Sequence, residues 1–298
     1  MMVKSNKKHD VVFNIINYTI FGVLTLLCVI PFYYLFINTI SDNDLVKRGL
    51  IRLIPHGFHL NNYVEVFKLR GLGQAAFISL SRTIGGTALT VLASAFVGYL
   101  VTKKNMWGRK FWYRYIIITM YFSAGLIPWY MNMVTLRLLN NFLAYILPTM
   151  IAPFSIILVK TYIESIPPSL EESASIDGAG TITIFTKIIL PLIKPILATI
   201  AIFAAVSHWN SFMDTLFLMT NEKLFSLQFV LWRYLNEANY LASIMRSGTT
   251  VAVNAAQALT PRTIQMTISM VVVFPILCAY PFMQRFFIKG IMVGAIKG

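Results

Sequence analysis

Six stretches of this 298-residue chain are each largely apolar over about the 20 residues that a helix needs to cross a bilayer. Inside lipid the backbone must satisfy its own hydrogen bonds, so such stretches predict helices. The sequence therefore predicts an all-α polytopic membrane protein with six transmembrane helices. The expected spans are Asn14–Asn38, Ala76–Val101, Tyr115–Val134, Phe142–Tyr162, Ile196–Phe217 and Ile264–Met283.

Composition excludes other classes of protein. Apolar residues make up 57% of the chain, charged residues 12%, and the mean hydropathy is +0.69. A soluble domain is about a quarter charged, so a soluble enzyme and a disordered chain are both excluded. The net charge of +14 fits cations that flank membrane spans better than a nucleic-acid surface. Cys28 and Cys278 lie in apolar runs, and no histidine or cysteine cluster has the spacing of a metal site.

The charges between the spans predict the orientation. Residues 102–114 carry five cations and no acid, which places this loop in the cytoplasm by the positive-inside rule. An even number of spans then places both termini there, and the first span is expected to be uncleaved. We expect a cytoplasmic tail over 1–13, a permease domain over 14–284 with long outer loops at 41–75 and 218–262, and a cytoplasmic tail over 285–298. Pro31, Gly85-Gly86, Pro128, Pro153 and Pro275 fall within spans and indicate broken helices.

The loop between the fourth and fifth spans, over 163–195, differs from the others. Ser169 followed by Glu172 matches a capping box, Glu171 and Glu172 favour a helix start, and Gly178 favours a stop. These signals predict a short helix over Leu170–Asp177. It could be a plain connector at the membrane interface, or a surface helix that docks into a partner.

The same loop resembles a known motif. Glu172-Ser173-Ala174, Gly178 and Ile188-x-Leu190-Pro191 keep every interval of the "EAA" loop found in the permease subunits of bacterial binding-protein-dependent ABC importers. The one departure is Ser173 in place of an alanine. Further similarity at 123–128, 208–210, 226–228 and 280–290 is to the carbohydrate branch, related to the second maltose-transporter membrane subunit. Within that branch, the chain looks most like permeases for oligosaccharides or polysaccharide fragments, including uronate-containing ones.

The resemblance implies a type I ABC importer permease fold in the bacterial cytoplasmic membrane. It implies two ATP-binding subunits that hold ATP and Mg²⁺, a second and different permease, an extracytoplasmic solute-binding protein and a carbohydrate substrate. The chain has no Gly-x4-Gly-Lys-[Ser/Thr] loop, so we expect no cofactor on it and no enzymatic activity of its own. The residues expected to couple it to the ATPase are Glu171, Glu172, Ser173, Ala174, Asp177, Gly178, Ala179, Ile188, Leu190 and Pro191.

Polar residues inside two spans are candidates for the substrate path, because such residues are costly in lipid. They are Arg82, His208, Trp209, Asn210 and Asp214. Trp209 and Asn210 suit a sugar, but the group could equally lie at the outer interface. Arg82 could bind an acidic sugar or extend to the interface as long cationic side chains do.

Two other classes of protein stay open on the residues alone. A stand-alone secondary sugar transporter would need intramembrane carboxylates for ion coupling, and only Asp214 qualifies. A membrane-embedded transferase would need a convergent catalytic or metal-binding cluster, and the sequence has none.

Overall fold

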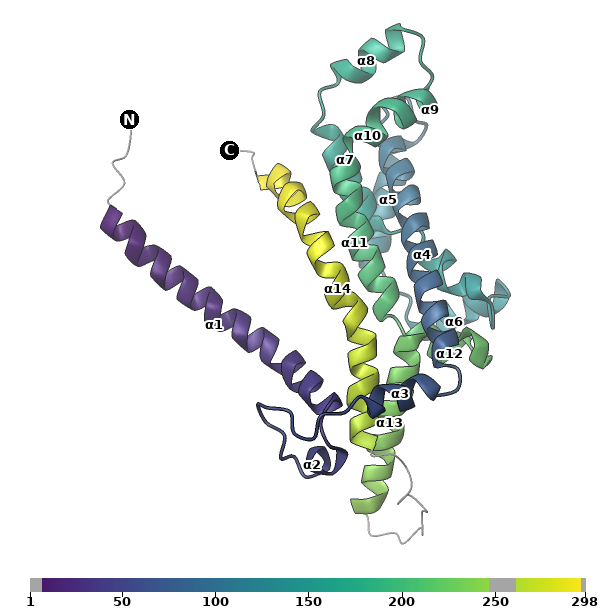
Figure 1. Cartoon of the computed structure of the whole chain (residues 1–298). Coiled ribbons are helices and arrows are strands. Elements are labelled where there is room, and N and C mark those ends of the chain that lie inside the picture. The colour runs from purple at the N-terminus through teal and green to yellow at the C-terminus, as the bar shows by residue number, and fades with distance from the viewer. Residues whose placement is uncertain (1–6, 247–260, 296–298) are drawn as a thin grey trace. The chain divides into compact units, whose positions relative to one another are not determined.

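A computed structural model describes residues 7–246 and 261–295, and within these ranges every regular element is a helix (Figure 1). The predicted tails are therefore described only for 7–13 and 285–295, and the outer loop 218–262 lacks 247–260. The chain divides into two compact units. The first comprises residues 1–69 and 234–271, and the second comprises residues 70–233 and 272–298.

In the first unit, α1 (Lys7–Thr39) is a single helix, and it continues through Pro31. Its apolar side chains are mostly exposed, and burial begins at Ile37, which packs with Val46 and Ile51. The predicted outer loop 41–75 contains two short helices, α2 (Asn43–Lys47) and α3 (Asn61–Lys68). Asn62 ties them to the end of α1 by donating to the Thr39 carbonyl at 3.0 Å and to the Asn43 side chain at 3.0 Å.

The second unit is built on α4 (Leu72–Leu100), which packs along α11 (Lys194–Asn210) and α7 (Pro153–Glu164). A stripe of small and polar residues at helical spacing lets these helices approach closely. A side chain at Gly86 would collide with the His208 ring of α11, and a Cβ at Gly98 would lie 2.7 Å from Val159 of α7. The buried stripe consists of Ala75, Ser79, Arg82, Gly86, Thr90, Ser94 and Gly98.

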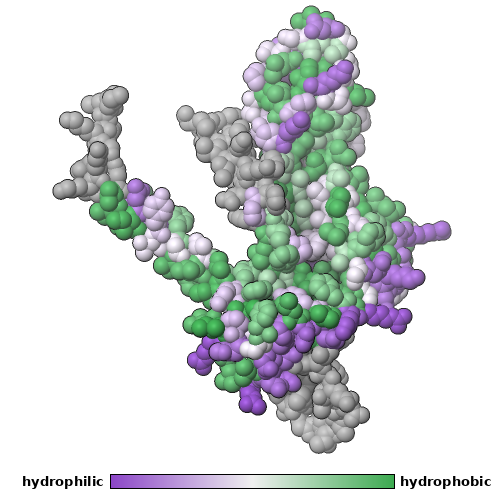
Figure 2. All heavy atoms as spheres, viewed as in Figure 1, coloured by the Kyte–Doolittle hydropathy of each residue, from purple (hydrophilic) through white to green (hydrophobic). Residues whose placement is uncertain are grey.

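Two apolar cores lie along α4. One surrounds Ala95 and Tyr99, where α7, α9 (Thr181–Ile184) and the start of α11 converge. The other surrounds Ile78, where the 3-10 helix η1 (Phe142–Tyr145) meets α12 (Met213–Leu218). Hydrophilic residues gather around α8 at one end of this unit, and a mainly apolar surface follows along the helices from there (Figure 2). This pattern is the one that a bilayer requires of a spanning protein.

Helices occupy all six predicted spans, and three of these spans, the third, fourth and fifth, are interrupted. The span predicted over 115–134 is two helices, α5 (Arg109–Tyr121) and α6 (Leu126–Thr135), separated where Gly125 takes a φ of 86°. The fourth is bent by 45° between Phe142–Thr149 and Pro153–Ile163, and includes η2 (Leu147–Thr149). The fifth ends at Asn210, and α12 follows after a break.

By length and apolar composition, two described helices can cross a membrane unaided, over Val11–Thr39 and Leu72–Leu100. The number rises to four if each bent pair forms one span. The sixth predicted span lies in α14 (Pro261–Ala295), which continues through Pro275. Within the predicted outer loop 218–262, η4 (Glu222–Leu224) is followed by α13 (Leu227–Arg246).

Candidate functional site

The short helix expected over Leu170–Asp177 exists as α8 (Ser169–Ile176), but it does not begin with the predicted capping box. Ser169 lies inside the first turn, and its side chain makes no cap. The amides of Glu171 and Glu172 donate instead to the Pro168 carbonyl at 3.0 and 3.1 Å. Proline has a φ that already suits a helix, and at Pro168 it is −60°, so Pro168 and not Ser169 is the N-cap residue.

The C-terminal end of α8 confirms the predicted glycine stop. Gly178 has a φ of 80°, its amide donates to the Ser175 carbonyl at 3.1 Å, and the Ala179 amide donates to the Ala174 carbonyl at 2.9 Å. This pair of bonds is a Schellman motif, which satisfies carbonyls that the helix itself leaves free. No atom lies within 4 Å of where a Cβ on Gly178 would be, so the glycine is required by backbone conformation and not by lack of space.

Helix α8 is held to the bundle by few side chains. Ala174 is its one buried residue, and with Ala179 it packs on the core around Tyr99. Glu172, Ser173 and Asp177 are exposed. The apolar side chain of Ile176 is 87% exposed. The helix therefore presents most of its surface outward.

The remaining predicted coupling residues connect α8 to α11. Ile188 lies in the π-helix η3 (Phe185–Ile189), and Leu190 and Pro191 lie in α10 (Leu190–Leu192). Ile188 and Leu190 pack on the same core as Ala174, whereas Pro191 is exposed. The chain bends by 78° between Thr181–Leu192 and α11. Proline has no N–H for the carbonyl four residues earlier, and the wider π turn lies just before Pro191.

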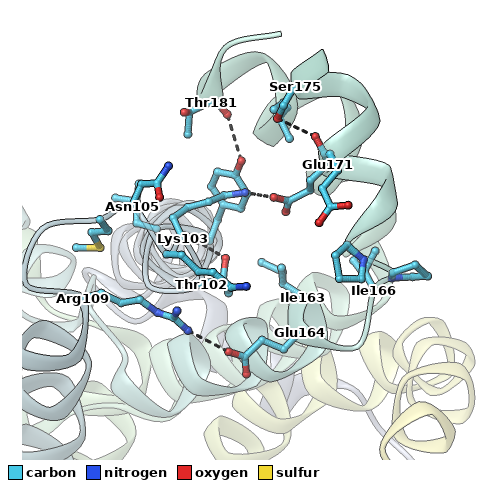
Figure 3. Close-up of a pocket in the computed structure, with 18 of the residues that line it drawn as sticks. Thr102, Lys103, Asn105, Arg109, Ile163, Glu164, Ile166, Glu171, Ser175 and Thr181 are labelled. Carbon is cyan, nitrogen blue, oxygen red and sulfur yellow. Dashed lines mark hydrogen bonds and ion pairs between the residues drawn. The ribbon is translucent and has the colours of Figure 1, made fainter. Parts of the chain in front are cut away.

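A cavity of about 1000 Å³ separates α8 from the end of α4 (Figure 3). Ionic contacts cross it or border it. Lys103 forms an ion pair with Glu171 of α8, and Arg109 pairs with Glu164 at 3.5 Å. Lys160 also reaches Glu164, at 2.6 Å. The cavity is lined by residues 99–100, 102–106, 109, 163–164, 166–168, 171–172, 175–176, 181 and 184.

Lys103 and Arg109 were expected only to orient the chain in the membrane. The structure gives them specific partners that sequence reasoning missed. Lys103 and Glu171 are 68 residues apart in the chain, so no local pattern connects them. The available signal was the concentration of cations at 102–114 and of acids at 164–177, which both belong to the side predicted to be cytoplasmic.

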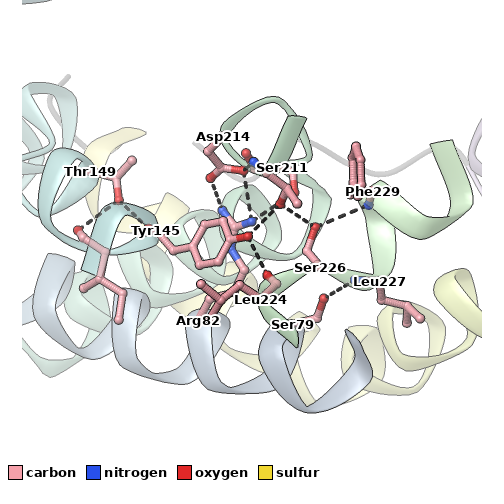
Figure 4. A network of polar contacts seen from close by, with 12 residues as sticks. Ser79, Arg82, Tyr145, Thr149, Ser211, Asp214, Leu224, Ser226, Leu227 and Phe229 are labelled. Carbon is pink, nitrogen blue, oxygen red and sulfur yellow. Dashed lines mark hydrogen bonds and ion pairs between the residues drawn. The ribbon is translucent and has the colours of Figure 1, made fainter. Parts of the chain in front are cut away.

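A second polar group lies farther along α4, where Arg82 is 1% exposed (Figure 4). Its guanidinium pairs with Asp214, donates to the Ser211 carbonyl at 3.2 Å and lies 4.3 Å from the centre of the Tyr145 ring. The Tyr145 hydroxyl in turn donates to the Leu224 carbonyl at 2.7 Å. The suggestion that Arg82 extends to the membrane interface is therefore wrong, because its charge is held inside the unit.

The other three candidates for the substrate path divide between buried and exposed. His208 and Trp209 are 4% and 8% exposed, and the Trp209 indole donates to the Val272 carbonyl at 3.1 Å. Asn210, at the end of α11, is exposed. Asp214 is brought to Arg82, and His208 to Gly86, but within the described residues Trp209 and Asn210 make no polar contact with Arg82 or Asp214. A role of these residues in a substrate path stays a prediction.

The described residues contain no group of three or more side chains that could hold a metal ion. The long apolar helices define a membrane-embedded protein. The short exposed helix α8, which lies outside their bundle, is typical of the membrane component of a transport system. The chain belongs to the family of binding-protein-dependent transport system inner membrane components, whose family model matches residues 90–293.

Similar proteins support this assignment over nearly the whole chain. The polygalacturonan/rhamnogalacturonan transport system permease protein YtcP of Bacillus subtilis is 32% identical over 286 residues, covering 96% of this chain and 98% of YtcP. The protein LplC of the same organism is 33% identical, covering 98% and 97%. A chain in the crystal structure of a bacterial ABC transporter involved in the import of the acidic polysaccharide alginate matches with a TM-score of 0.82. It is 27% identical and covers 96% of this chain and 100% of that chain.

These likenesses confirm the expected all-α permease fold and the expected family. The chain is thus a permease subunit of an ABC importer. A permease of this kind works with an ATPase, a binding protein and a second permease.

Proposed function

We propose that this permease carries a carbohydrate, and specifically an oligosaccharide or polysaccharide fragment that contains acidic sugars. The observation that carries the proposal is the full-length likeness to YtcP, named for polygalacturonan and rhamnogalacturonan transport, joined by the fold likeness to the alginate importer. A third relative, the arabinooligosaccharide permease AraQ of Halalkalibacterium halodurans, is 28% identical and covers 93% of the chain. All three names describe polysaccharides or oligosaccharides, and alginate is named as an acidic one.

In the proposed complex, α8 is the coupling helix and inserts into a cleft of an ATPase subunit. Two features support this role: α8 has a defined start after Pro168 and a defined stop at Gly178, and its exposed face bears Glu172, Ser173 and the apolar side chain of Ile176. Glu172 would meet a cation of the ATPase. ATP and Mg²⁺ would be held by two such subunits and not by this chain. The motion would then pass through Leu190 and Pro191 into α11.

The proposal also sets the orientation and the remaining partners. The face that bears α8 lies in the cytoplasm with both termini, and the segments 41–75 and 218–262 face outward toward a solute-binding protein. A second, different permease completes the translocation path. Asn210 at the end of α11, Arg82 and Asp214 would lie near this path.

The test is affinity purification of the tagged chain in mild detergent, with mass spectrometry of the proteins that accompany it. We expect an ATPase with a Walker motif and a second permease, both lost in Glu172→Lys while the variant still reaches the membrane. The complex in liposomes, with its binding protein, should take up galacturonate oligomers only with ATP. Uptake by the chain alone without ATP would replace this proposal with the secondary transporter.

A further inference from the structure

Helix α8 has two neighbouring glutamates that differ in their surroundings. The Glu171 side chain turns toward the cavity and pairs with Lys103, and both side chains are about a quarter exposed, at 26% and 23% (Figure 3). Glu172 is exposed and makes no ion pair within the described residues. The two acids therefore cannot do the same work, although the sequence alone gave them one role.

Lys103 is itself fixed by the end of α4. Its amide continues the last turn by donating to the Leu100 carbonyl at 3.0 Å, and its ammonium lies 4.1 Å from the centre of the Tyr99 ring. A cation over an aromatic face is held electrostatically by the ring. The Lys103 ammonium therefore lies between the Tyr99 ring and the Glu171 carboxylate.

Tyr99 also holds the chain on the far side of α8. It is 1% exposed, its hydroxyl donates to the Thr181 carbonyl at 3.4 Å, and its ring lies 5.0 Å from that of Phe185. The end of α4 therefore touches the coupling segment at two places, before and after the loop at 177–180. The rest of the attachment is the small contact of Ala174 and Ala179.

We propose that Lys103 is a positioning residue for coupling, which sets the direction of α8 by pairing with Glu171 while its own ammonium lies over the Tyr99 ring. This pair fixes α8 to the end of α4, in addition to its covalent connections to α7 through 165–168 and to α11 through Leu190 and Pro191. The inference rests on the proposed role of α8 in coupling. An ion pair of this exposure contributes little to stability, so its effect is on orientation and not on folding.

The first test is a charge exchange in the purified complex, measured as ATP hydrolysis in lipid nanodiscs. Lys103→Glu and Glu171→Lys should each lower the ATPase activity about fivefold, the factor that a pair worth about 1 kcal/mol produces. The double variant Lys103→Glu/Glu171→Lys should recover at least half of the loss. Lys103→Arg, which keeps the charge, should stay close to the natural protein.

Two matched controls separate this role from docking and from general charge. Glu172→Lys should abolish the ATPase activity. Adding Lys103→Glu to this variant should restore no activity, because Glu172 does not contact Lys103. Lys110 is exposed, does not line the cavity and has no ion pair within the described part of the chain, so Lys110→Glu should behave like the natural protein. The proposal would be overturned if Lys103→Glu/Glu171→Lys hydrolysed ATP no faster than the less active of the two single variants.

The second test uses the chain without partners, so that it does not depend on the proposed function. Spin labels are placed at two exposed residues, Ser173 of α8 and Leu92 of α4, after Cys28 and Cys278 are changed to Ser. The distance distribution should broaden in Lys103→Glu and narrow again in the charge exchange. An unchanged distribution would refute the positioning role even if an ATPase co-purifies. A missing ATPase with a broadened distribution would refute only the docking.

Discussion

Two ion pairs lie along helix α4 and are built from the same parts in different surroundings. Lys103 meets Glu171 just beyond the helix end, and Arg82 meets Asp214 inside the bundle. Arg82 lies 18 residues before Leu100, the last residue of α4, so about 27 Å of helix separates Arg82 from the helix end near Lys103, at about 1.5 Å per residue. In each site the cation also lies over a tyrosine ring, at 4.1 and 4.3 Å.

The difference between the sites is access to water. The side chains of Arg82 and Asp214 are 1% and 13% exposed, whereas those of Lys103 and Glu171 are 23% and 26% exposed. A buried charge that loses its partner has no solvent to replace it, so the inner pair fixes the fold around it. A partly exposed pair can open at low cost. Opening the pair beside α8 should therefore cost less free energy than opening the inner pair.

The largest effect is expected from breaking the inner pair. Asp214→Ala would leave the Arg82 guanidinium buried without its carboxylate, which should lower the free energy of unfolding by about 3–5 kcal/mol. Thermal unfolding in detergent measures this loss. The control is Asp177→Ala, at an exposed acid with no ion pair among the described residues. Equal melting temperatures for both variants would mean that the inner pair does not hold the fold.

The next effect comes from the helix contact beside the inner pair. Gly86→Ala would drive a methyl group into the His208 ring, and overpacking of this kind costs about 1–3 kcal/mol. The control is Gly73→Ala in the same helix, where no atom lies within 4 Å of the added Cβ, so the change should be neutral or slightly stabilising. Measuring the thermal unfolding of both variants separates the effect of overpacking at Gly86 from the effect of alanine on helix propensity, which the two variants share. Equal stability would show that α4 and α11 can move apart at no cost.

A smaller and local effect is expected at the end of α8. Gly178→Ala forces a residue with a side chain to a φ of 80°, at a cost of about 1–2 kcal/mol. Amide hydrogen exchange at Gly178 and Ala179 should become faster, because those amides hold the Schellman bonds. Gly180 has a φ of −70° and equal space, so Gly180→Ala should leave exchange unchanged. Slow exchange in both variants would contradict the conformational argument.

The smallest effect on stability is expected at the outer pair. Lys103→Ala should change the free energy of unfolding by about 1 kcal/mol or less, and the difference should shrink as salt is added. The same variant should nevertheless reduce ATP hydrolysis by the complex. Thermal unfolding at low and high salt, set beside Asp214→Ala, checks the contrast. A loss as large as that of Asp214→Ala would mean that both pairs are structural.

The positions of the helices could be predicted from the sequence, but their continuity could not. Hydropathy places an apolar segment, while a break depends on how the backbone is satisfied by its neighbours. Pro31 and Pro275 lie inside continuous helices, although both were expected to interrupt them. The break in the third span lies before α6, at Gly125, and not at Pro128, which falls in the first turn that follows, where proline is tolerated.

The coupling segment was predictable where a local pattern decides the structure. Gly178 stops α8 because only the backbone matters there. The predicted start of α8 was wrong. Ser169 and Glu172 match the capping-box pattern, but the Glu171 and Glu172 amides donate to the Pro168 carbonyl instead of to the Ser169 side chain. Arg82 and Asp214, 132 residues apart, were both singled out as costly polar residues, yet nothing in a single sequence joins them.

The way α8 begins and ends has a consequence for how such a protein can diverge. Both ends are held by main-chain bonds and by Pro168 and Gly178, and Ala174 is the one residue whose size is constrained by burial. The exposed positions of the helix can therefore be rewritten with almost no penalty to the membrane scaffold. If α8 docks into an ATPase subunit as proposed, changes at a few outward side chains would alter which ATPase subunit the permease accepts and leave its membrane helices intact.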